Sequence, residues 1–228
     1  MSNPRIQLIH AVMAAQAPIH EAFSRLWPEA RPVDLADTSL AADIADLSAV
    51  GDLNGDALAD AFTGRMAALI RYGVATGASA VLFTCSAFGA AIERARQGVA
   101  IPVLKPDEAM IARALSLGAR IGGLATFAPT IPSLASELEA AAGAVRLNPE
   151  IELRHVAGAL DSLNAGDRAE HDRLIVEAAA GMEGFDALLL AQFTMSGLRN
   201  AIPDVPARTV LASPDEAVLK LRGLLDEG

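Results

Sequence analysis

Short apolar segments alternate with longer helical patterns along this 228-residue chain. The apolar segments are rich in Val, Ile and Leu, as expected of strands buried on both faces of a parallel sheet. This alternation predicts an α/β fold with helices on both faces of the sheet. The expected strands are residues 5–11, 32–36, 78–84, 101–104, 120–126, 151–156, 187–191 and 208–211. The expected helices are residues 18–26, 56–76, 87–96, 107–117, 130–142, 167–182 and 214–225, with a short helix from Met195.

The two halves of the chain show a hint of duplication. In each half a later apolar strand ends in a short polar motif, as in residues 81–85 and 188–192. This duplication predicts two similar βαβ lobes. We expect the first lobe to contain residues 1–104 and 212–228, and the second to contain residues 105–211.

Composition favours a folded protein and argues against nucleic-acid binding. Hydrophobic residues make up 52% of the chain, enough for a substantial core without disulfides or metals. The net charge of −10 opposes binding to nucleic-acid phosphates or to an anionic membrane surface. Aromatic residues make up only 4%, which disfavours base stacking. We therefore expect no nucleic-acid partner.

The common signatures of cofactor and metal binding are absent from the sequence. It has no Gly-rich nucleotide motif after the first strand, no Walker A pattern and no His-Glu-x-x-His. The pair Gly122-Gly123 fits strand packing better than a phosphate cradle. A single cysteine excludes an intrachain disulfide and a multi-cysteine metal centre, and it suits a reducing compartment.

Hydropathy gives no sign of a membrane protein. No apolar run reaches the length of a membrane span, and the N-terminus lacks a secretory signal pattern. We expect a soluble cytoplasmic protein with no cofactor and no membrane partner. A homodimer is the default expectation for its assembly.

The only cysteine, Cys85, follows an apolar strand and precedes a helical pattern. Loops at the carboxyl ends of parallel strands form the ligand crevice of open α/β sheets. Hydroxyls of Thr84 and Ser86 could hold a carboxylate there, and helix-start amides would stabilise a thiolate. Two structural alternatives stay open: the thiol packs as a small hydrophobe, and Ser86 only caps the next helix.

Two further polar motifs stand at strand ends in the second half. One contains Thr126 and Thr130, and the other contains Gln192, Phe193 and Thr194. These side chains could bind a carboxylate. Alternatively, Thr130 caps one helix, and Thr194 or Ser196 caps the other. The amide of Gln192 can donate and accept hydrogen bonds but cannot carry a proton near neutral pH.

Two titratable residues end the first two strands. His10 could act as an acid or base or bind a carboxylate, or it could only hydrogen-bond to the backbone. Asp37 could cap the following turn or orient a site residue. The nearby carboxylates are expected to form a solvated face; they are Asp43, Asp46 and Asp52.

These strand-end motifs, in this order, resemble the aspartate/glutamate/hydantoin racemase superfamily over nearly the whole chain. The segments that carry the resemblance are residues 35–40, 83–86, 101–110, 124–130 and 188–192. The resemblance implies an α/β fold of two similar lobes, each a parallel, flavodoxin-like sheet flanked by helices, with an active-site cleft between them. It also implies cofactor-independent isomerase chemistry in amino acid metabolism.

In that family two cysteines, one in each lobe, remove and return a proton at the carbon α to a carboxylate or carbonyl. The resemblance implies that Cys85 is the catalytic first-lobe cysteine, while the second-lobe position falls at Gln192. It also implies a small carboxylate-bearing substrate. The implied substrate-binding residues are His10, Thr84, Ser86, Thr126, Thr130, Gln192, Phe193 and Thr194.

The missing second thiol makes two-base racemisation doubtful and leaves two alternatives. The first is a one-cysteine decarboxylase, tautomerase or lyase of the arylmalonate decarboxylase type, although that type keeps the second-lobe cysteine. The second is a non-catalytic member that binds a carboxylate.

Overall fold

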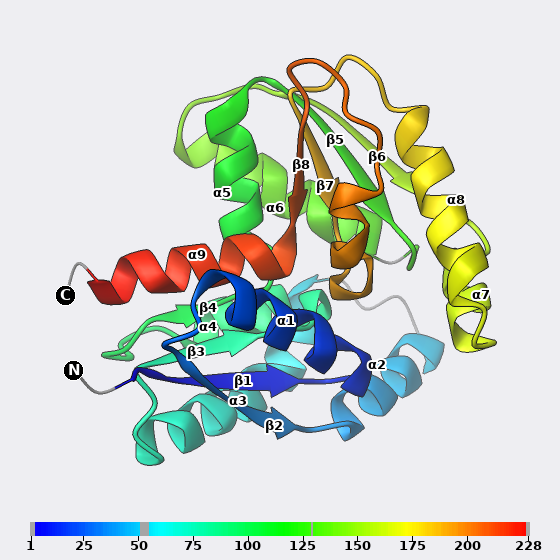
Figure 1. Ribbon diagram of the computed structural model, residues 1–228. Coiled ribbons are helices and arrows are strands. Elements are labelled where there is room, and N and C mark those ends of the chain that lie inside the picture. The colour runs from blue at the N-terminus through cyan, green and yellow to red at the C-terminus, as the bar shows by residue number, and fades with distance from the viewer. Residues whose placement is uncertain (1–2, 51–54, 129, 227–228) are drawn as a thin grey trace. The chain divides into compact units, whose positions relative to one another are not determined.

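The computed structural model describes residues 3–50, 55–128 and 130–226. The chain divides into two compact units, residues 1–106 with 217–228, and residues 107–216. Each unit contains one four-stranded parallel sheet with flanking helices (Figure 1). This confirms the expected α/β fold of two similar lobes. The first boundary between the units follows residue 106, two residues later than expected. The second boundary follows residue 216, five residues later than expected.

In the first unit the strand order is β2-β1-β3-β4, and all neighbouring strands are parallel. The strands are β1 (Arg5–His10), β2 (Arg31–Ala36), β3 (Ala80–Phe83) and β4 (Val103–Leu104). The helices are η1 (Met13–Ala15), α1 (Gln16–Leu26), α2 (Ser39–Val50), α3 (Gly55–Ala75), η2 (Ser86–Phe88) and α4 (Gly89–Ala95), where η marks a 3-10 helix.

The core of the first unit forms where α3 covers one face of the sheet. Phe62, Met66 and Ile70 recur at four-residue spacing, so they share one side of α3 and are all buried. They pack against strand residues that include Phe83. The rings of Phe62 and Phe88 meet edge to face, with centroids 4.9 Å apart. Burial of each such side chain contributes about 1.5–3 kcal/mol.

The second unit repeats the same strand order as β6-β5-β7-β8. Its strands are β5 (Arg120–Ala125), β6 (Glu150–His155), β7 (Ala187–Leu190) and β8 (Thr209–Ala212). Its helices are α5 (Glu108–Leu117), α6 (Thr130–Ala144), α7 (Ala159–Asn164), α8 (Arg168–Ala180) and η3 (Phe193–Asn200). The second boundary between the units, after residue 216, falls within α9 (Ser213–Asp226).

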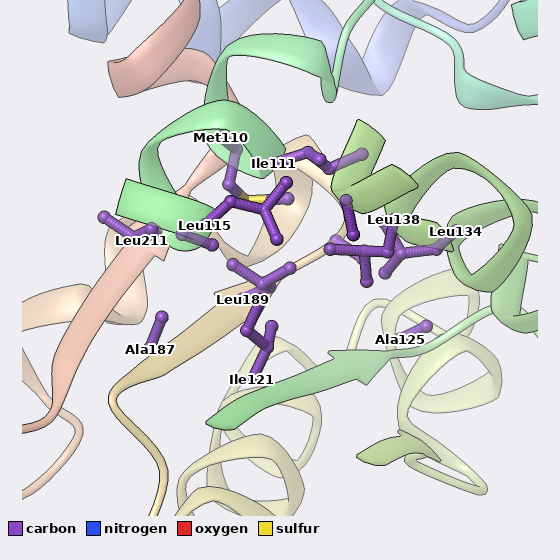
Figure 2. Packing of buried hydrophobic residues seen from close by; sticks show 13 residues of the cluster. Met110, Ile111, Leu115, Ile121, Ala125, Leu134, Leu138, Ala187, Leu189 and Leu211 are labelled. Carbon is purple, nitrogen blue, oxygen red and sulfur yellow. The ribbon is translucent and has the colours of Figure 1, made fainter. Parts of the chain in front are cut away.

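Two apolar clusters cover the two faces of the second sheet. On one face, Leu189 of β7 lies among apolar side chains of α5 and α6, including Leu115 and Leu138 (Figure 2). On the other face, Leu188 and Leu190 pack with a cluster that includes Ile175 of α8. Successive strand residues therefore enter opposite clusters, which explains why β7 is apolar at every position.

Gly122 and Gly123 permit close packing on both faces of β5. A Cβ atom at Gly122 would lie 2.8 Å from the Met182 side chain, and one at Gly123 would lie 2.6 Å from the Leu153 side chain. Neither position tolerates a larger residue without displacement of its neighbour. The expected packing role of this pair is confirmed.

Several elements differ from the sequence-based prediction. The helices α2 and α7 were not expected, because α2 has no clear apolar period and α7 has only six residues. The helix expected from Met195 is a 3-10 helix that begins at Phe193.

Among the described helices, none combines the length and apolar character that a membrane crossing requires.

Candidate active site

Polar side chains gather at the carboxyl ends of β1 and β3, which are neighbouring parallel strands (Figure 1). Ile9 is level with Phe83, so His10 lies beside Thr84 where the two strands end. Cys85 follows with an extended backbone, and η2 begins at the next residue. This local structure is the expected passage from strand to helical turn.

Cys85 lies between the core and the surface. Its side chain is partly buried and packs against the apolar cluster that includes Phe83 and Phe88. Thr84, one residue earlier, bonds instead to His10. Neighbouring side chains of an extended segment point to opposite faces of a sheet. The thiol and the Thr84 hydroxyl therefore leave the end of β3 on opposite faces.

The imidazole of His10 joins the carboxyl-end regions of three strands. His10 Nδ1 lies 2.9 Å from Thr84 Oγ1 of the β3 end, and Nε2 lies 2.9 Å from Asp34 Oδ1 of β2. His10 is fully buried, so its two ring nitrogens have these protein partners in place of water. His20 of α1 bonds to the same carboxylate, with Nε2 2.9 Å from Asp34 Oδ1.

The protonation states of His10 and Asp34 follow from burial and from the hydrogen bonds to the Asp34 carboxylate. Burial lowers the pKa of His10 below its ordinary value, although the bond to Asp34 opposes this shift. Burial acts to raise the pKa of Asp34, but hydrogen bonds from His20 and His10 outweigh it and lower that pKa. Near neutral pH the arrangement is therefore a neutral His10 beside an ionised Asp34.

Asp37, which follows β2, is held by a helix of the same unit. Arg65 Nε donates to Asp37 Oδ2 at 2.8 Å, and Ser39 Oγ donates to Asp37 Oδ1 at 2.7 Å. Arg65 Nη1 also bonds to Asp43 at 2.5 Å. The expectation that Asp43 is only solvated is therefore wrong. Asp37 also accepts a hydrogen bond from the Ser39 backbone, as the turn-capping alternative predicts. Of the other two carboxylates, Asp46 is exposed and Asp52 lies outside the described residues.

In the second unit the structure brings together three of the predicted residues. Gln192 follows β7, and its Oε1 accepts from the backbone N–H of Thr126 at 2.7 Å and lies 3.4 Å from the Thr126 hydroxyl. Gln192 Nε2 donates to Thr130 Oγ1 at 2.9 Å. The amide thus bridges the ends of β5 and β7 and the first residue of α6.

The other predicted residues differ in exposure. Ser86 is partly exposed, and the N-cap residue of η2 is Cys85, which makes no side-chain cap bond. Phe193 is buried, with 5% of its surface exposed. Thr194 is partly exposed, and its carbonyl accepts a bond from Arg168 at 3.2 Å.

Sequence reasoning missed Asp34 and gave His20 little weight. Asp34 is a carboxylate between apolar residues of an expected strand, which was the one available signal.

Within residues 3–50, 55–128 and 130–226, no group of three or more His, Cys, Asp or Glu side chains has the arrangement of a metal site.

Two parallel sheets of identical strand order, each with polar side chains after its strands, define a duplicated α/β protein. The chain belongs to the Asp/Glu/Hydantoin racemase family, whose model matches residues 14–221. No curated protein sequence matches the chain significantly.

Solved structures share the fold at low sequence identity. A glutamate racemase from Bacillus anthracis has a TM-score of 0.72 and 14% identity, over 100% of this chain and 83% of that chain. An allantoin racemase from Klebsiella pneumoniae has a TM-score of 0.70 and 18% identity, over 99% and 89% of the two chains. A double mutant of arylmalonate decarboxylase has a TM-score of 0.60 and 18% identity, over 97% and 93%.

Proposed function

We propose that the protein is an enzyme that transfers a proton at the carbon α to a carboxylate or carbonyl of a small metabolite, with Cys85 as the group that carries the proton. One observation carries the proposal: the only thiol of a racemase-family chain stands, partly exposed, at the carboxyl end of a buried parallel strand. A thiol ionises near pH 8.5 when unperturbed, close enough to neutrality for acid–base work.

Removal of an α proton places negative charge on the oxygens of the carboxylate or carbonyl. Hydrogen-bond donors aimed at those oxygens lower the barrier, by about 3 kcal/mol for each well-placed donor in a dry site. Ser86 and Thr84 both adjoin Cys85 in sequence, but only Ser86 is partly exposed, so its hydroxyl is the nearest accessible donor. We assign it to the developing oxyanion.

The position that the family resemblance assigns to a second cysteine holds Gln192 in this chain, which favours proton transfer by one thiol only. Its amide does not titrate, and both of its ends are engaged, with Thr126 and Thr130. A two-base racemisation needs a proton carrier on each face of the carbon. The second candidate function is therefore a one-thiol decarboxylase, tautomerase or lyase, in which Cys85 delivers a proton to one face only.

A substrate panel in heavy water tests the proposal and separates the two candidates. The panel contains aspartate, glutamate, a hydantoin, allantoin and an arylmalonate, and NMR measures deuterium at the α carbon. Chiral chromatography then measures product configuration. Racemisation gives both enantiomers, whereas one-thiol chemistry gives one. Binding of a panel member in a thermal shift assay, with neither exchange nor turnover for any member, would contradict catalysis and support a carboxylate-binding protein.

A further inference from the structure

The loop that follows β1 exposes two large apolar side chains next to the loop that carries Cys85. Val12 is 44% exposed and Met13 is 53% exposed. β1 and β3 are neighbouring parallel strands, so the loops that follow them leave the sheet side by side. Cys85 packs against the apolar cluster that contains Ala11. The two exposed side chains therefore come directly after a residue that shares a cluster with the thiol.

The second unit repeats this arrangement. The strand orders of the two sheets match, so β5 is the counterpart of β1, and β7 is the counterpart of β3. Phe127 lies two residues beyond the end of β5, as Val12 lies two residues beyond the end of β1, and Phe127 is 48% exposed. Gln192 and Cys85 likewise lie two residues beyond β7 and β3. Recurrence at one position of the fold separates these apolar side chains from the scattered ones that soluble proteins normally expose.

The two loops of the first unit contain no charged side chain. Residues 11–15, between β1 and α1, and residues 84–88, between β3 and α4, include no Asp, Glu, Lys or Arg. Burial of a charged group without a partner is costly. A charged substituent on a ligand would therefore find no counter-ion in these loops.

Two cationic side chains near other strand ends of this sheet have acidic partners. Arg65 of α3 bonds to Asp37, which follows β2, and to Asp43. Lys105, which follows β4, lies 3.6 Å from Glu93 of α4. The positive charge of both side chains is therefore balanced within the first unit.

We propose that the substrate carries an uncharged, apolar substituent on its α carbon, and that Val12 and Met13 are the specificity-determining residues that contact this substituent. The inference rests on the proposed function, because it places the substituent on a substrate held at Cys85. It selects an arylmalonate, or a hydantoin with an alkyl side chain, over aspartate and glutamate, whose side chains carry a second carboxylate.

The single cysteine allows a test that needs no known substrate. N-isobutyl-iodoacetamide and N-iodoacetylglycinamide are both uncharged and similar in size, but the first ends in an isopropyl group and the second in a polar amide. With each reagent the Cys85 thiolate displaces iodide and forms one carbon–sulfur bond, and intact mass spectrometry follows the rate. The ratio of the two rates cancels the thiolate fraction. The same ratio for N-acetylcysteinamide, a free thiol, corrects for the intrinsic reactivity of the reagents.

The ratio of the isobutyl rate to the glycinamide rate should exceed the free-thiol ratio by roughly tenfold, the preference that partial burial of a leucine-sized group provides. The double variant Val12→Ala/Met13→Ala should lose most of this preference, and both residues are exposed, so the fold should persist. Val74→Ala is the matched control, because Val74 is 47% exposed on α3, which ends shortly before the amino end of β3. This control should keep the preference. Equal ratios for the wild-type protein and the free thiol, or an undiminished preference in the double variant, would overturn the inference.

A second measurement separates this inference from the proposed function. Cys85-dependent deuterium exchange should be roughly tenfold faster in 5-isobutylhydantoin than in 5-(carboxymethyl)hydantoin, which shares its ring and has a side chain of similar shape. Faster exchange in the carboxymethyl compound would overturn the inference and leave the proposed proton transfer standing. Absence of Cys85-dependent exchange in both compounds and in the whole substrate panel would overturn the proposed function, whereas an intact alkylation preference would still support the apolar contact.

Discussion

Gln192 Oε1 accepts a hydrogen bond from the backbone N–H of Thr126 at 2.7 Å, across the ends of two neighbouring strands. The other end of the same amide donates to Thr130 at 2.9 Å. The position that the family resemblance assigns to a second cysteine therefore holds a loop together in this chain. These hydrogen bonds give the glutamine a structural role.

Replacement of this amide should destabilise the second unit. Gln192→Ala removes the partner of the Thr126 N–H and of the Thr130 hydroxyl, and an unsatisfied buried polar group costs about 1–3 kcal/mol. Gln192→Glu keeps an acceptor for Thr126 and offers a second oxygen to Thr130, so it should lose less. Urea denaturation measures both variants. Equal stability of Gln192→Ala and the wild type would show that this bridge contributes nothing.

The stability of the protein should fall as pH drops below about 7. His10 has a lowered pKa in the folded state because it is buried, whereas an unfolded histidine binds a proton near pH 6.5. Below that pH the unfolded state therefore binds more protons than the folded state, and the free energy of unfolding decreases until the folded pKa is passed. Thermal unfolding at several pH values measures the slope, and His10→Asn should reduce it. An unchanged slope in His10→Asn would assign the pH dependence to other groups.

Two glycine substitutions should have opposite effects on stability. A Cβ atom at Gly118 would overlap the Asp186 carboxylate, which accepts from the Arg120 backbone N–H at 2.9 Å. Gly118→Ala should therefore destabilise by about 1–3 kcal/mol. Gly64 lies within α3 with no atom near its missing Cβ, so Gly64→Ala should stabilise by about 0.5–1 kcal/mol. Denaturant midpoints test both. An unchanged midpoint in Gly118→Ala would contradict the clash at Gly118, and a lowered midpoint in Gly64→Ala would contradict the open space at Gly64.

The strand ends could be predicted because buried apolar runs stop at polar residues. Cys85, Thr126 and Gln192 were singled out in this way, and the structure places each within two residues of the end of its strand. The contact between Gln192 and Thr130 could not be predicted, because it joins residues 62 positions apart and depends on which strands are neighbours. Knowledge of the strand order supplies that missing information.

The hydrogen-bond chain around His10 escaped prediction for a related reason. Asp34 has only the pattern of one polar residue in a short strand, and His20 has only that of a polar helix position. Their convergence depends on β1 pairing with β2 in parallel register and on α1 carrying His20 back to the same carboxylate. No local sequence pattern indicates that His10, Asp34 and His20 lie together.

The central claim is that the Cys85 thiol carries the proton, and deuterium incorporation at the α carbon of the substrate in heavy water tests it most directly. Cys85→Ala should lower the incorporation rate by about a hundredfold or more, the usual contribution of a positioned acid or base. Gly64→Ala, whose added Cβ atom meets no neighbouring atom, should retain the wild-type rate. Exchange at the wild-type rate in a folded Cys85→Ala protein would contradict the claim.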